Sequence, residues 1–273
     1  MRLYHYTTIE AFAKIWVSKQ MKFSESKNTN DLFEKRKTWE FVSGIIPTEK
    51  ETTLIEAFNI FAKAFSDVLA QYKQISFATD YKEISGNKSS MMWGQYAHNE
   101  NGVCIEFDSD KLPKLKSIYQ SKVKYTYNVP AIRFDKEELL DKEYLQRFVK
   151  KYRKMLFFTK HKHWEHENEY RIISDTLDYL PIERAITKIY VYDPNNINTN
   201  VVERIVNDEV PIYYLYISHL YGDRRIGCDN LKSLREYEKK IKDEPDYYTN
   251  KEKVSKRWKE IADKFGLSIE TVK

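Results

Sequence analysis

The chain has little cysteine, glycine or proline, and it has no long apolar run. Its two cysteines, Cys104 and Cys228, are too few for a disulfide framework and fit a reducing cytosol. Seven glycines and seven prolines argue against long disordered linkers. No stretch approaches the ~20 consecutive apolar residues of a membrane span, and the opening Met-Arg-Leu-Tyr-His does not lead into the apolar run of a signal peptide. We therefore expect a cytoplasmic protein without a membrane segment.

The charges nearly balance, and aromatic residues are abundant. The 46 basic and 41 acidic residues leave a formal net charge of +5, which is too mild to indicate a nucleic-acid binder by itself. The 21 Tyr, 14 Phe and 5 Trp predict a well-packed globule with aromatic-lined clefts. With 273 residues, the chain is long enough for one large domain or for a main domain with an appendage.

The stretch His163–Arg171 carries an unusual density of ionisable residues. Every second position is charged, at Glu165, Glu167, Glu169 and Arg171, and the stretch runs directly into Ile172 and Ile173. In an extended strand these alternate residues would share one face. Burying such charges is costly unless they are paired or serve binding or chemistry. The stretch is therefore a candidate site.

Apolar periodicity predicts a mixture of short strands and helices. Alternation favours strands over residues 2–7, 21–24, 74–79, 103–107, 169–174, 186–192 and 211–217, with an edge strand over 117–127. Helical spacing favours helices over 48–72, 90–98, 136–158 and 199–207, and Thr8 is placed to cap a further helix. Because strands and helices do not alternate regularly, we predict an α+β fold rather than a doubly wound α/β fold.

The composition changes near the C-terminus. We expect a main domain over residues 1–228 and a helical appendage over 229–273, with charged helices over 231–243 and 251–265. The end, Trp258–Val272, resembles the core of a helix-turn-helix, with Gly266 at the turn and Ser268 as a cap. Its second helix stops after about five residues, which is short for a recognition helix. The alternative is a helical tail that packs on the main domain.

Four separated pieces of the sequence resemble one known family. They are Leu3–Thr7, Asn30–Glu34, Met92–Ala97 followed by Gly102–Asp108, and Trp164–Arg171. In this order they resemble the bacterial family called "domain of unknown function 2971" over roughly the first 220 residues. Leu32 stands where the family commonly has proline. Glu100 stands where a histidine often precedes the Gly-Val-Cys segment, which weakens any role for that position.

The layout is also similar, more distantly, to the ADP-ribosyltransferase superfamily, whose members split NAD across a cleft between two small sheets. This resemblance implies small mixed or antiparallel sheets around a cleft, flanked by helices, with NAD as the substrate. It implies that His5 binds the nicotinamide ribose, that Tyr96 or the strand Ser76–Thr79 shapes the pocket, and that Glu169 directs the chemistry. The candidate catalytic residues are Glu169 and Glu167, and the candidate cofactor-binding residues are His5, Tyr6, Tyr96, Trp93, Ser76 and Arg171.

The implied chemistry proceeds through an oxocarbenium-like ribose as nicotinamide leaves. Glu169 would stabilise the positive charge, Glu167 would orient the acceptor's nucleophile, and His5 would donate a hydrogen bond to a ribose hydroxyl or to the adenosine. Each residue also has a structural alternative. The two glutamates can simply pair with Arg171 or with a basic residue of the preceding helix. His5 can be a half-buried histidine bonded to backbone, and Trp93 can be a core residue.

Two further clusters have structural interpretations that we favour. His161, His163, Glu165 and His166 have partial metal-ligand spacing, but no nearby ligand completes a set, so we expect a solvated turn and no metal. The basic stretch 147–162 could contact phosphates of NAD, RNA or DNA, with a solvated helix face as the alternative. Its basic residues are Arg147, Lys150, Lys151, Arg153, Lys154, Lys160 and Lys162.

The sequence therefore leaves three functional hypotheses open. The first is transfer of ADP-ribose from NAD to a macromolecular acceptor, in a bacterial toxin or phage-defence effector. The second is a non-enzymatic module on the same fold that binds nucleic acid or protein, and the third is a nucleotide sensor without turnover. The first hypothesis requires that His5, Tyr96 and Glu169 line one cleft.

Overall fold

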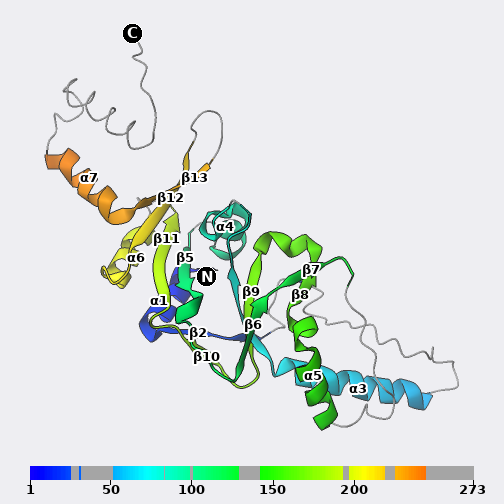
Figure 1. Ribbon diagram of the computed structural model, residues 1–273. Coiled ribbons are helices and arrows are strands. Elements are labelled where there is room, and N and C mark those ends of the chain that lie inside the picture. Colours follow the sequence, from blue (N-terminus) through cyan, green and yellow to red (C-terminus); the bar gives the residue numbers. More distant parts are fainter. Residues whose placement is uncertain are drawn as a thin grey trace.

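The computed structural model describes residues 1–25, 31, 52–82, 84–98, 101–128, 142–192, 197–218 and 225–243. A nine-stranded sheet forms its centre (Figure 1). The strand order is β13 (Arg225–Asn230), β12 (Ile212–Ser218), β11 (Ile186–Tyr192), β5 (Val103–Asp108), β1 (Arg2–Thr7), β4 (Lys73–Ala78), β9 (Glu169–Ser174) and β6 (Ile118–Lys122), and β3 (Ser24–Glu25) pairs with β4 off this path. The pairing is antiparallel throughout this sheet except between β11 and β12, which are parallel. Helices and mixed sheets together confirm the α+β prediction.

The sheet is weakly joined at its middle, between β1 and β4. The one register pair there is Tyr4↔Ala78, whereas β1 pairs with β5 along its whole length and β4 does so with β9. We call this junction the β1–β4 seam. It divides the sheet into a β1 half-sheet (β13, β12, β11, β5, β1) and a β4 half-sheet (β4, β9, β6, β3). Figure 1 shows the two half-sheets with α4 at the upper end between them.

Helices cover both half-sheets. They are α1 (Ile9–Ser18), α3 (Thr52–Ala70), α4 (Ser90–Tyr96), α5 (Lys142–Phe157), α6 (Ile197–Val206) and α7 (Leu231–Asp243), with 3-10 helices over Gly86–Lys88, Ser109–Lys111 and Lys162–Glu167. Two strand pairs lie outside the main sheet: β2 (Gln20–Lys22) with β10 (Tyr179–Pro181), and β7 (Lys124–Thr126) with β8 (Thr159–His161). The Thr8 hydroxyl accepts from the Ala11 N–H and caps α1 as predicted. None of the described helices combines the length and the apolar character that crossing a bilayer requires.

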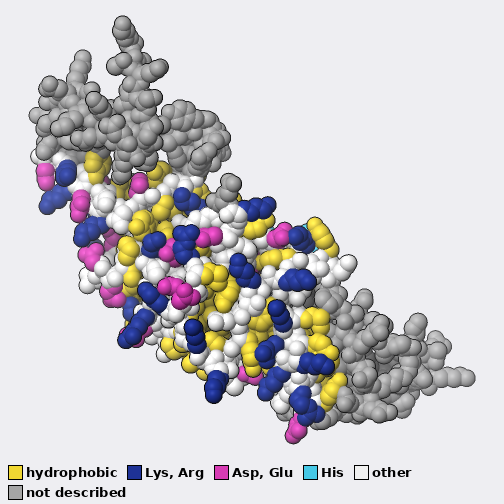
Figure 2. Space-filling model, viewed as in Figure 1, with side chains coloured by type: hydrophobic (Ala, Val, Ile, Leu, Met, Phe, Trp, Pro, Cys, Tyr) yellow, Lys and Arg dark blue, Asp and Glu magenta, His cyan; other side chains and the backbone are white. Residues whose placement is uncertain are grey.

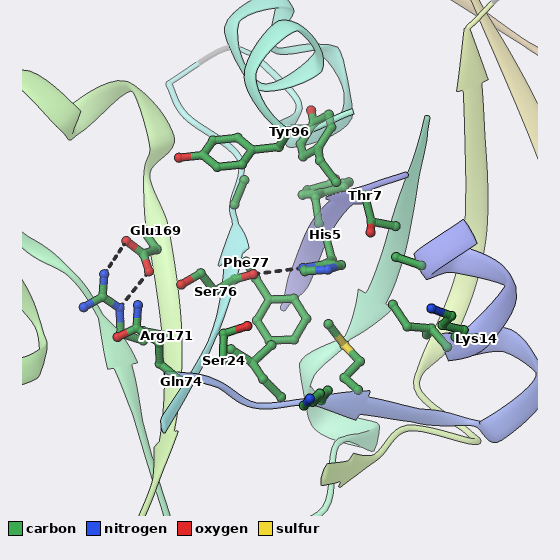
Figure 3. Close-up of a pocket in the computed structure, with 18 of the residues that line it drawn as sticks. His5, Thr7, Lys14, Ser24, Gln74, Ser76, Phe77, Tyr96, Glu169 and Arg171 are labelled. Carbon is green, nitrogen blue, oxygen red and sulfur yellow. Dashed lines mark hydrogen bonds and ion pairs between the residues drawn. The ribbon is translucent and has the colours of Figure 1, made fainter. Parts of the chain in front are cut away.

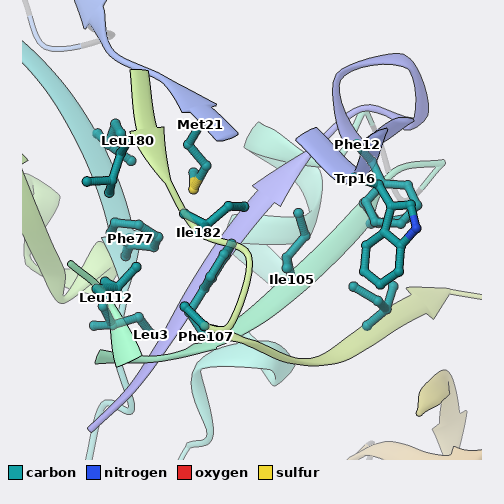
Figure 4. Packing of buried hydrophobic residues seen from close by; sticks show 14 of the residues in the cluster. Leu3, Phe12, Trp16, Met21, Phe77, Ile105, Phe107, Leu112, Leu180 and Ile182 are labelled. Atoms are coloured by element: carbon teal, nitrogen blue, oxygen red, sulfur yellow. The ribbon is translucent and has the colours of Figure 1, made fainter. Parts of the chain in front are cut away.

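Apolar packing holds the half-sheets together where backbone pairing is missing. Leu3 of β1, Phe77 of β4 and Phe107 of β5 belong to one buried cluster (Figure 4). The rings of Phe77 and Phe107 meet edge to face with centroids 5.4 Å apart. Full burial of such a side chain stabilises the fold by about 1.5–3 kcal/mol. Phe12 and Trp16 bring α1 onto the same cluster, so α1 has a fixed position beside the seam.

The strand predicted over 169–174 is β9, and the charged residues before it are not extended. Residues Lys162–Glu167 form a 3-10 helix, and Asn168 ends it with φ at 42°. The Asn168 side chain supports this left-handed conformation by donating to the Thr79 hydroxyl and the Asp80 carbonyl, both at 2.6 Å. The alternation of charges therefore does not reflect a strand, and Glu165 pairs with Lys162 outside the sheet.

Other boundaries also differ from the sequence predictions. The strand expected over 117–127 is two strands, β6 and β7, which belong to different sheets. The domain boundary expected between residues 228 and 229 falls inside β13, a strand that the sequence did not indicate. The expected helix over 231–243 is α7. The helix over 251–265 and the helix-turn-helix resemblance over 258–272 lie outside the described residues.

Candidate functional site

A pocket of about 1310 Å³ opens at the β1–β4 seam. This exceeds the ~300–1,000 Å³ typical of small-molecule sites, so it has room for a dinucleotide. Its walls include seven of the predicted site residues: His5, Tyr6, Ser76, Tyr96, Glu167, Glu169 and Arg171. Figure 3 shows Glu169 and Arg171 on one side, His5, Thr7 and Lys14 on the other, and Ser76 and Phe77 between them. The requirement that His5, Tyr96 and Glu169 share one cleft is met.

His5 takes the place of a backbone pair at the seam. Its Nδ1 lies 3.1 Å from the Ser76 carbonyl oxygen. Burial lowers the pKa of His5 below its ordinary value, although the Ser76 carbonyl opposes this by favouring the protonated ring. In the neutral ring Nδ1–H donates to that carbonyl, which leaves Nε2 as an acceptor. In this tautomer His5 can accept a hydrogen bond from a ligand hydroxyl, whereas the predicted donation to a ligand needs a ring that is protonated at both nitrogens.

Four buried charged side chains form the opposite side, which we call the carboxylate wall: Lys160, Glu167, Glu169 and Arg171. Arg171 donates two parallel hydrogen bonds to Glu169, from Nε to Oε1 at 2.7 Å and from Nη2 to Oε2 at 2.8 Å. Lys160 Nζ lies 2.5 Å from Glu167 Oε2 and 3.5 Å from Glu169 Oε2. The Tyr96 hydroxyl donates to Glu167 Oε1 at 2.5 Å. The structural alternative of paired carboxylates is thus present, but the pairs line a pocket.

Glu169 is ionised near neutral pH. Burial favours its neutral form, yet the charges of Arg171 and Lys160 and the hydrogen bonds from Arg171 and Ser76 lower its pKa to about 2. A carboxylate with such a pKa is a poor proton acceptor near neutral pH, where an efficient general base has a pKa close to 7. It is instead suited to stabilising a positive charge that develops beside it. The surroundings of Glu169 therefore favour a role in stabilising a positive charge rather than in accepting a proton.

The outer end of the pocket has a different character. Lys14 and Ser18 of α1 and Lys22 of β2 line it. Val17 and Tyr179 also line it, and they are 80% and 50% exposed. The pocket thus runs from a buried wall with fixed anions to an open end with exposed cations and an aromatic ring.

Two predicted cofactor-binding residues have other roles. Trp93 is 1% exposed and is not among the lining residues, and its Nε1 donates to the Asn87 carbonyl at 2.8 Å. It packs edge to face on Tyr6 in a buried cluster, so the core alternative describes it better. Tyr6 borders the pocket, but its hydroxyl donates to the Gly86 carbonyl. Because its hydroxyl proton is used in that bond, Tyr6 can contact a ligand mainly through its ring.

The histidine cluster and the basic stretch are each divided between different elements of the described structure. The rings of His161 and His163 lie 4.3 Å apart, and His166 Nδ1 lies 3.2 Å from the His163 carbonyl. Among the described residues, no group of three or more His, Cys, Asp or Glu side chains is placed to hold a metal ion. The basic stretch is not one helix face, because α5 ends at Phe157 and Lys160 turns inward from β8.

Lys160 is the site residue that the sequence interpretation missed, because it was counted with the surface-facing basic residues. No local pattern in the sequence marks it, because its inward direction is visible only in the structure, where Phe158 and Lys160 are buried and Thr159 and His161 are half-buried. Such a period of two is typical of a strand. A lysine on the inward face of a strand needs buried carboxylates, and Glu167 and Glu169 follow within ten residues.

The fold and the pocket define an α+β protein with a buried carboxylate wall at a sheet seam. Comparison of the sequence with family models finds one match: residues 92–172 match the family described as "Protein of unknown function (DUF2971)". This confirms the resemblance to that family, over a stretch that runs from α4 to β9 and contains Tyr96, Lys160, Glu167, Glu169 and Arg171. No curated protein and no solved structure gives a significant match to the chain.

Proposed function

We propose that the seam pocket binds NAD and that Glu169 promotes transfer of ADP-ribose from NAD to a macromolecular acceptor. One observation carries this proposal: His5, Tyr96 and Glu169, which lie far apart in the sequence, line the same pocket, with an anionic carboxylate across from a neutral imidazole. These are the residues to which the ADP-ribosyltransferase resemblance assigns ribose binding, pocket shape and chemistry. Action as a bacterial toxin or phage-defence effector stays a prediction from that resemblance.

The chemistry uses the fixed charge of the carboxylate wall. The bond between ribose C1′ and the nicotinamide nitrogen breaks, and its electron pair leaves with nicotinamide, so positive charge develops on the ribose. Glu169 stabilises that charge without changing its own protonation. The acceptor's nucleophile then bonds to C1′ and releases its proton to water. Glu167, held by Tyr96 and Lys160, is the candidate that orients the nucleophile.

In the proposed complex a dinucleotide extends from the carboxylate wall to the outer end of the pocket. His5 Nε2 would accept from a ribose hydroxyl, and the Tyr96 ring would contact the nicotinamide. Lys14 and Lys22 at the outer end would attract the diphosphate, and Tyr179 offers a ring for adenine. This orientation places the scissile bond at the carboxylate wall.

The test is nicotinamide release from NAD, followed by mass spectrometry, with calorimetric NAD binding measured in parallel. Wild-type protein should bind NAD and release nicotinamide in the presence of a cell extract that supplies acceptors, whereas Glu169→Gln should bind but release almost none. Glu106→Gln is the matched control, because Glu106 is equally buried but does not line the pocket. If the wild type binds NAD but releases no nicotinamide, the hypothesis of ADP-ribose transfer gives way to that of a nucleotide sensor. If the wild type does not bind NAD, the pocket is not an NAD site.

One observation favours a second candidate function, nucleic-acid binding by α5. Its residues Arg147, Lys150, Lys151 and Lys154 are all exposed at helical spacing. Figure 2 shows Lys and Arg side chains gathered over the end of the molecule where α5 lies.

Reversing Lys150, Lys151 and Lys154 to Glu should abolish salt-dependent RNA or DNA retention. The same reversal of Lys232, Lys239 and Lys240, which are exposed on α7, is the control for net charge. Equal loss in both variants would contradict a specific surface on α5.

A further inference from the structure

Lys160 occupies an unusual place for a lysine. It follows α5 on the short strand β8 and is 7% exposed. Its Nζ contacts Glu167 Oε2 at 2.5 Å and Glu169 Oε2 at 3.5 Å, and it lies 4.8 Å from the centre of the Trp164 ring. Burying an ammonium group costs several kcal/mol unless good partners offset the lost hydration. The two carboxylates provide that offset, so Lys160 is part of the carboxylate wall rather than of the basic surface.

The charges of the wall cancel only when Lys160 is present. Glu167 and Glu169 contribute two negative charges, and Lys160 and Arg171 contribute two positive ones. Arg171 is directed at Glu169 and at the Phe157 carbonyl, which accepts from Nη1 at 2.7 Å. Among the described residues, Lys160 is the cation that pairs with Glu167. Without it, two buried carboxylates would share one arginine.

We infer that Lys160 is a positioning residue that holds Glu167 and Glu169 side by side as an ionised pair in the pocket wall. The inference deepens the proposed function and rests on it for its catalytic meaning. The contacts of Lys160 with Glu167 and Glu169 support the positioning role whether or not the protein acts on NAD. A neutral wall with fixed internal charges can present an anion to the ribose without taking up a proton, which is the property that the proposed chemistry requires.

Side chains from several elements meet Lys160 at the carboxylate wall. Glu167 comes from the 3-10 helix, Glu169 and Arg171 from β9, and Tyr96 from α4 through its bond to Glu167. Tyr125 of β7 accepts a hydrogen bond from the Glu169 N–H, and burial, followed by the charge of Glu169, raises the pKa of its hydroxyl. Tyr125 therefore supplies no proton near neutral pH. When the ammonium is removed, the carboxylate pair must take up a proton from water instead.

The first test needs no NAD. The free energy of unfolding is measured against pH for the wild type, Lys160→Met and the double variant Lys160→Met/Glu167→Gln. Methionine keeps most of the length and the apolar character of the lysine stem but removes its charge. We expect the acid-side loss of stability in Lys160→Met to begin at least about one pH unit higher than in the wild type. The double variant has one carboxylate and one arginine, so its profile should return toward that of the wild type.

The outcomes separate a positioning role from simple packing. If the Lys160→Met profile overlays the wild-type profile, the inference is wrong. If Lys160→Met does not fold, the double variant must recover a folded protein, because it removes the unpaired carboxylate. A double variant that also fails to fold would overturn the inference, since lost packing would then be the cause.

The second test links Lys160 to the proposed chemistry. The acid limb of nicotinamide release should move to higher pH in Lys160→Met, and Lys160→Arg should restore the wild-type position of that limb. An unchanged limb in Lys160→Met would contradict the catalytic part of the inference. If the wild-type protein releases no nicotinamide at any pH, the proposed function fails, and the unfolding profiles still decide the role of Lys160.

Discussion

Glu106 and Glu169 are two buried carboxylates of the same sheet, and of the two Glu169 lines the seam pocket. Both side chains are 4% exposed and both have a cationic partner. Glu106 of β5 accepts from the Tyr190 hydroxyl at 2.7 Å and the Thr187 hydroxyl at 2.9 Å, and it lies 3.4 Å from Lys188 Nζ. Glu169 of β9 is bound by Arg171 and Lys160.

The difference between them does not lie in their own backbone pairing. β5 is paired with β1 and β11, and β9 is paired with β4 and β6, so each carboxylate belongs to a strand that has a partner on both sides. The Glu169 side chain lines the seam pocket, whereas Glu106 is not among the lining residues. Burial and pairing of a carboxylate therefore do not by themselves mark a site. The position of Glu169 at the seam pocket marks it.

The largest expected effect is on stability and comes from the partners of the two carboxylates. Arg171 is 2% exposed, whereas Lys188 is 33% exposed. Arg171→Met should cost about 3–5 kcal/mol, because it leaves a buried carboxylate with less compensation. Lys188→Met should cost at most about 1 kcal/mol, because its ion pair is partly in water. Urea unfolding measures both. Equal costs would contradict the distinction between the two clusters.

The second effect is on turnover. Glu169→Gln should lower the rate of nicotinamide release by about 10²–10³-fold, the usual loss when one electrostatic stabiliser of a transition state is removed. Glu106→Gln should leave the rate within about threefold, because its side chain does not line the pocket. Circular dichroism checks that both variants are folded at the assay temperature. A similar loss in both variants would show that folding, and not the site, is being measured.

The third effect is on acid stability. The pKa of Glu169 is about 2 in the folded protein, below its ordinary 4.5. Its ionised form therefore contributes stability that is fully present above about pH 4.5 and is lost as the pH falls toward 2, by about 3 kcal/mol. Glu169→Gln should flatten this part of the unfolding profile, which acid titration at fixed urea can follow. An acid limb as steep as in the wild type would assign the loss to other carboxylates.

The smallest effect is on ligand affinity and tests the wall opposite Glu169. Burial lowers the pKa of His5 below 6.5, so its Nε2 stays an acceptor above that pH and becomes a donor only when the ring is protonated at lower pH. The affinity for ADP-ribose should be steady above about pH 6.5 and fall about fivefold at lower pH, the worth of one hydrogen bond. His5→Asn should remove this dependence, and Glu106→Gln should keep it. Calorimetric titrations that show the same pH dependence in His5→Asn would exclude His5 as the contact.

Much of the local structure could be predicted from the sequence. The strands at Arg2–Thr7 and Val103–Asp108 follow from alternating or continuous apolar residues, and the cap at Thr8 follows from its side chain. The 3-10 helix over Lys162–Glu167 could not be predicted by period, because alternating charges there happen to match a strand. Its ending depends on Asn168, whose partners Thr79 and Asp80 lie about 90 residues away.

The candidate site could be predicted in its residue types but not in its arrangement. The family motifs indicated His5, Tyr96 and Glu169, and the structure places all three at one pocket. The seam itself arises from the register between β1 and β4, which no local pattern encodes. Lys160 was hidden for a related reason, since its inward direction depends on where α5 ends and β8 begins.

The most direct test of the seam pocket as a nucleotide site is nitrogen NMR of the His5 ring during titration with ADP-ribose. The six histidines of the chain are assigned with the aid of His5→Asn. The account predicts that the Nε2 resonance of His5 shifts as ligand binds, because it accepts a ribose hydroxyl. The Nδ1 resonance should stay in place, because it remains bonded to Ser76. An unchanged His5 ring at ligand saturation would contradict the account.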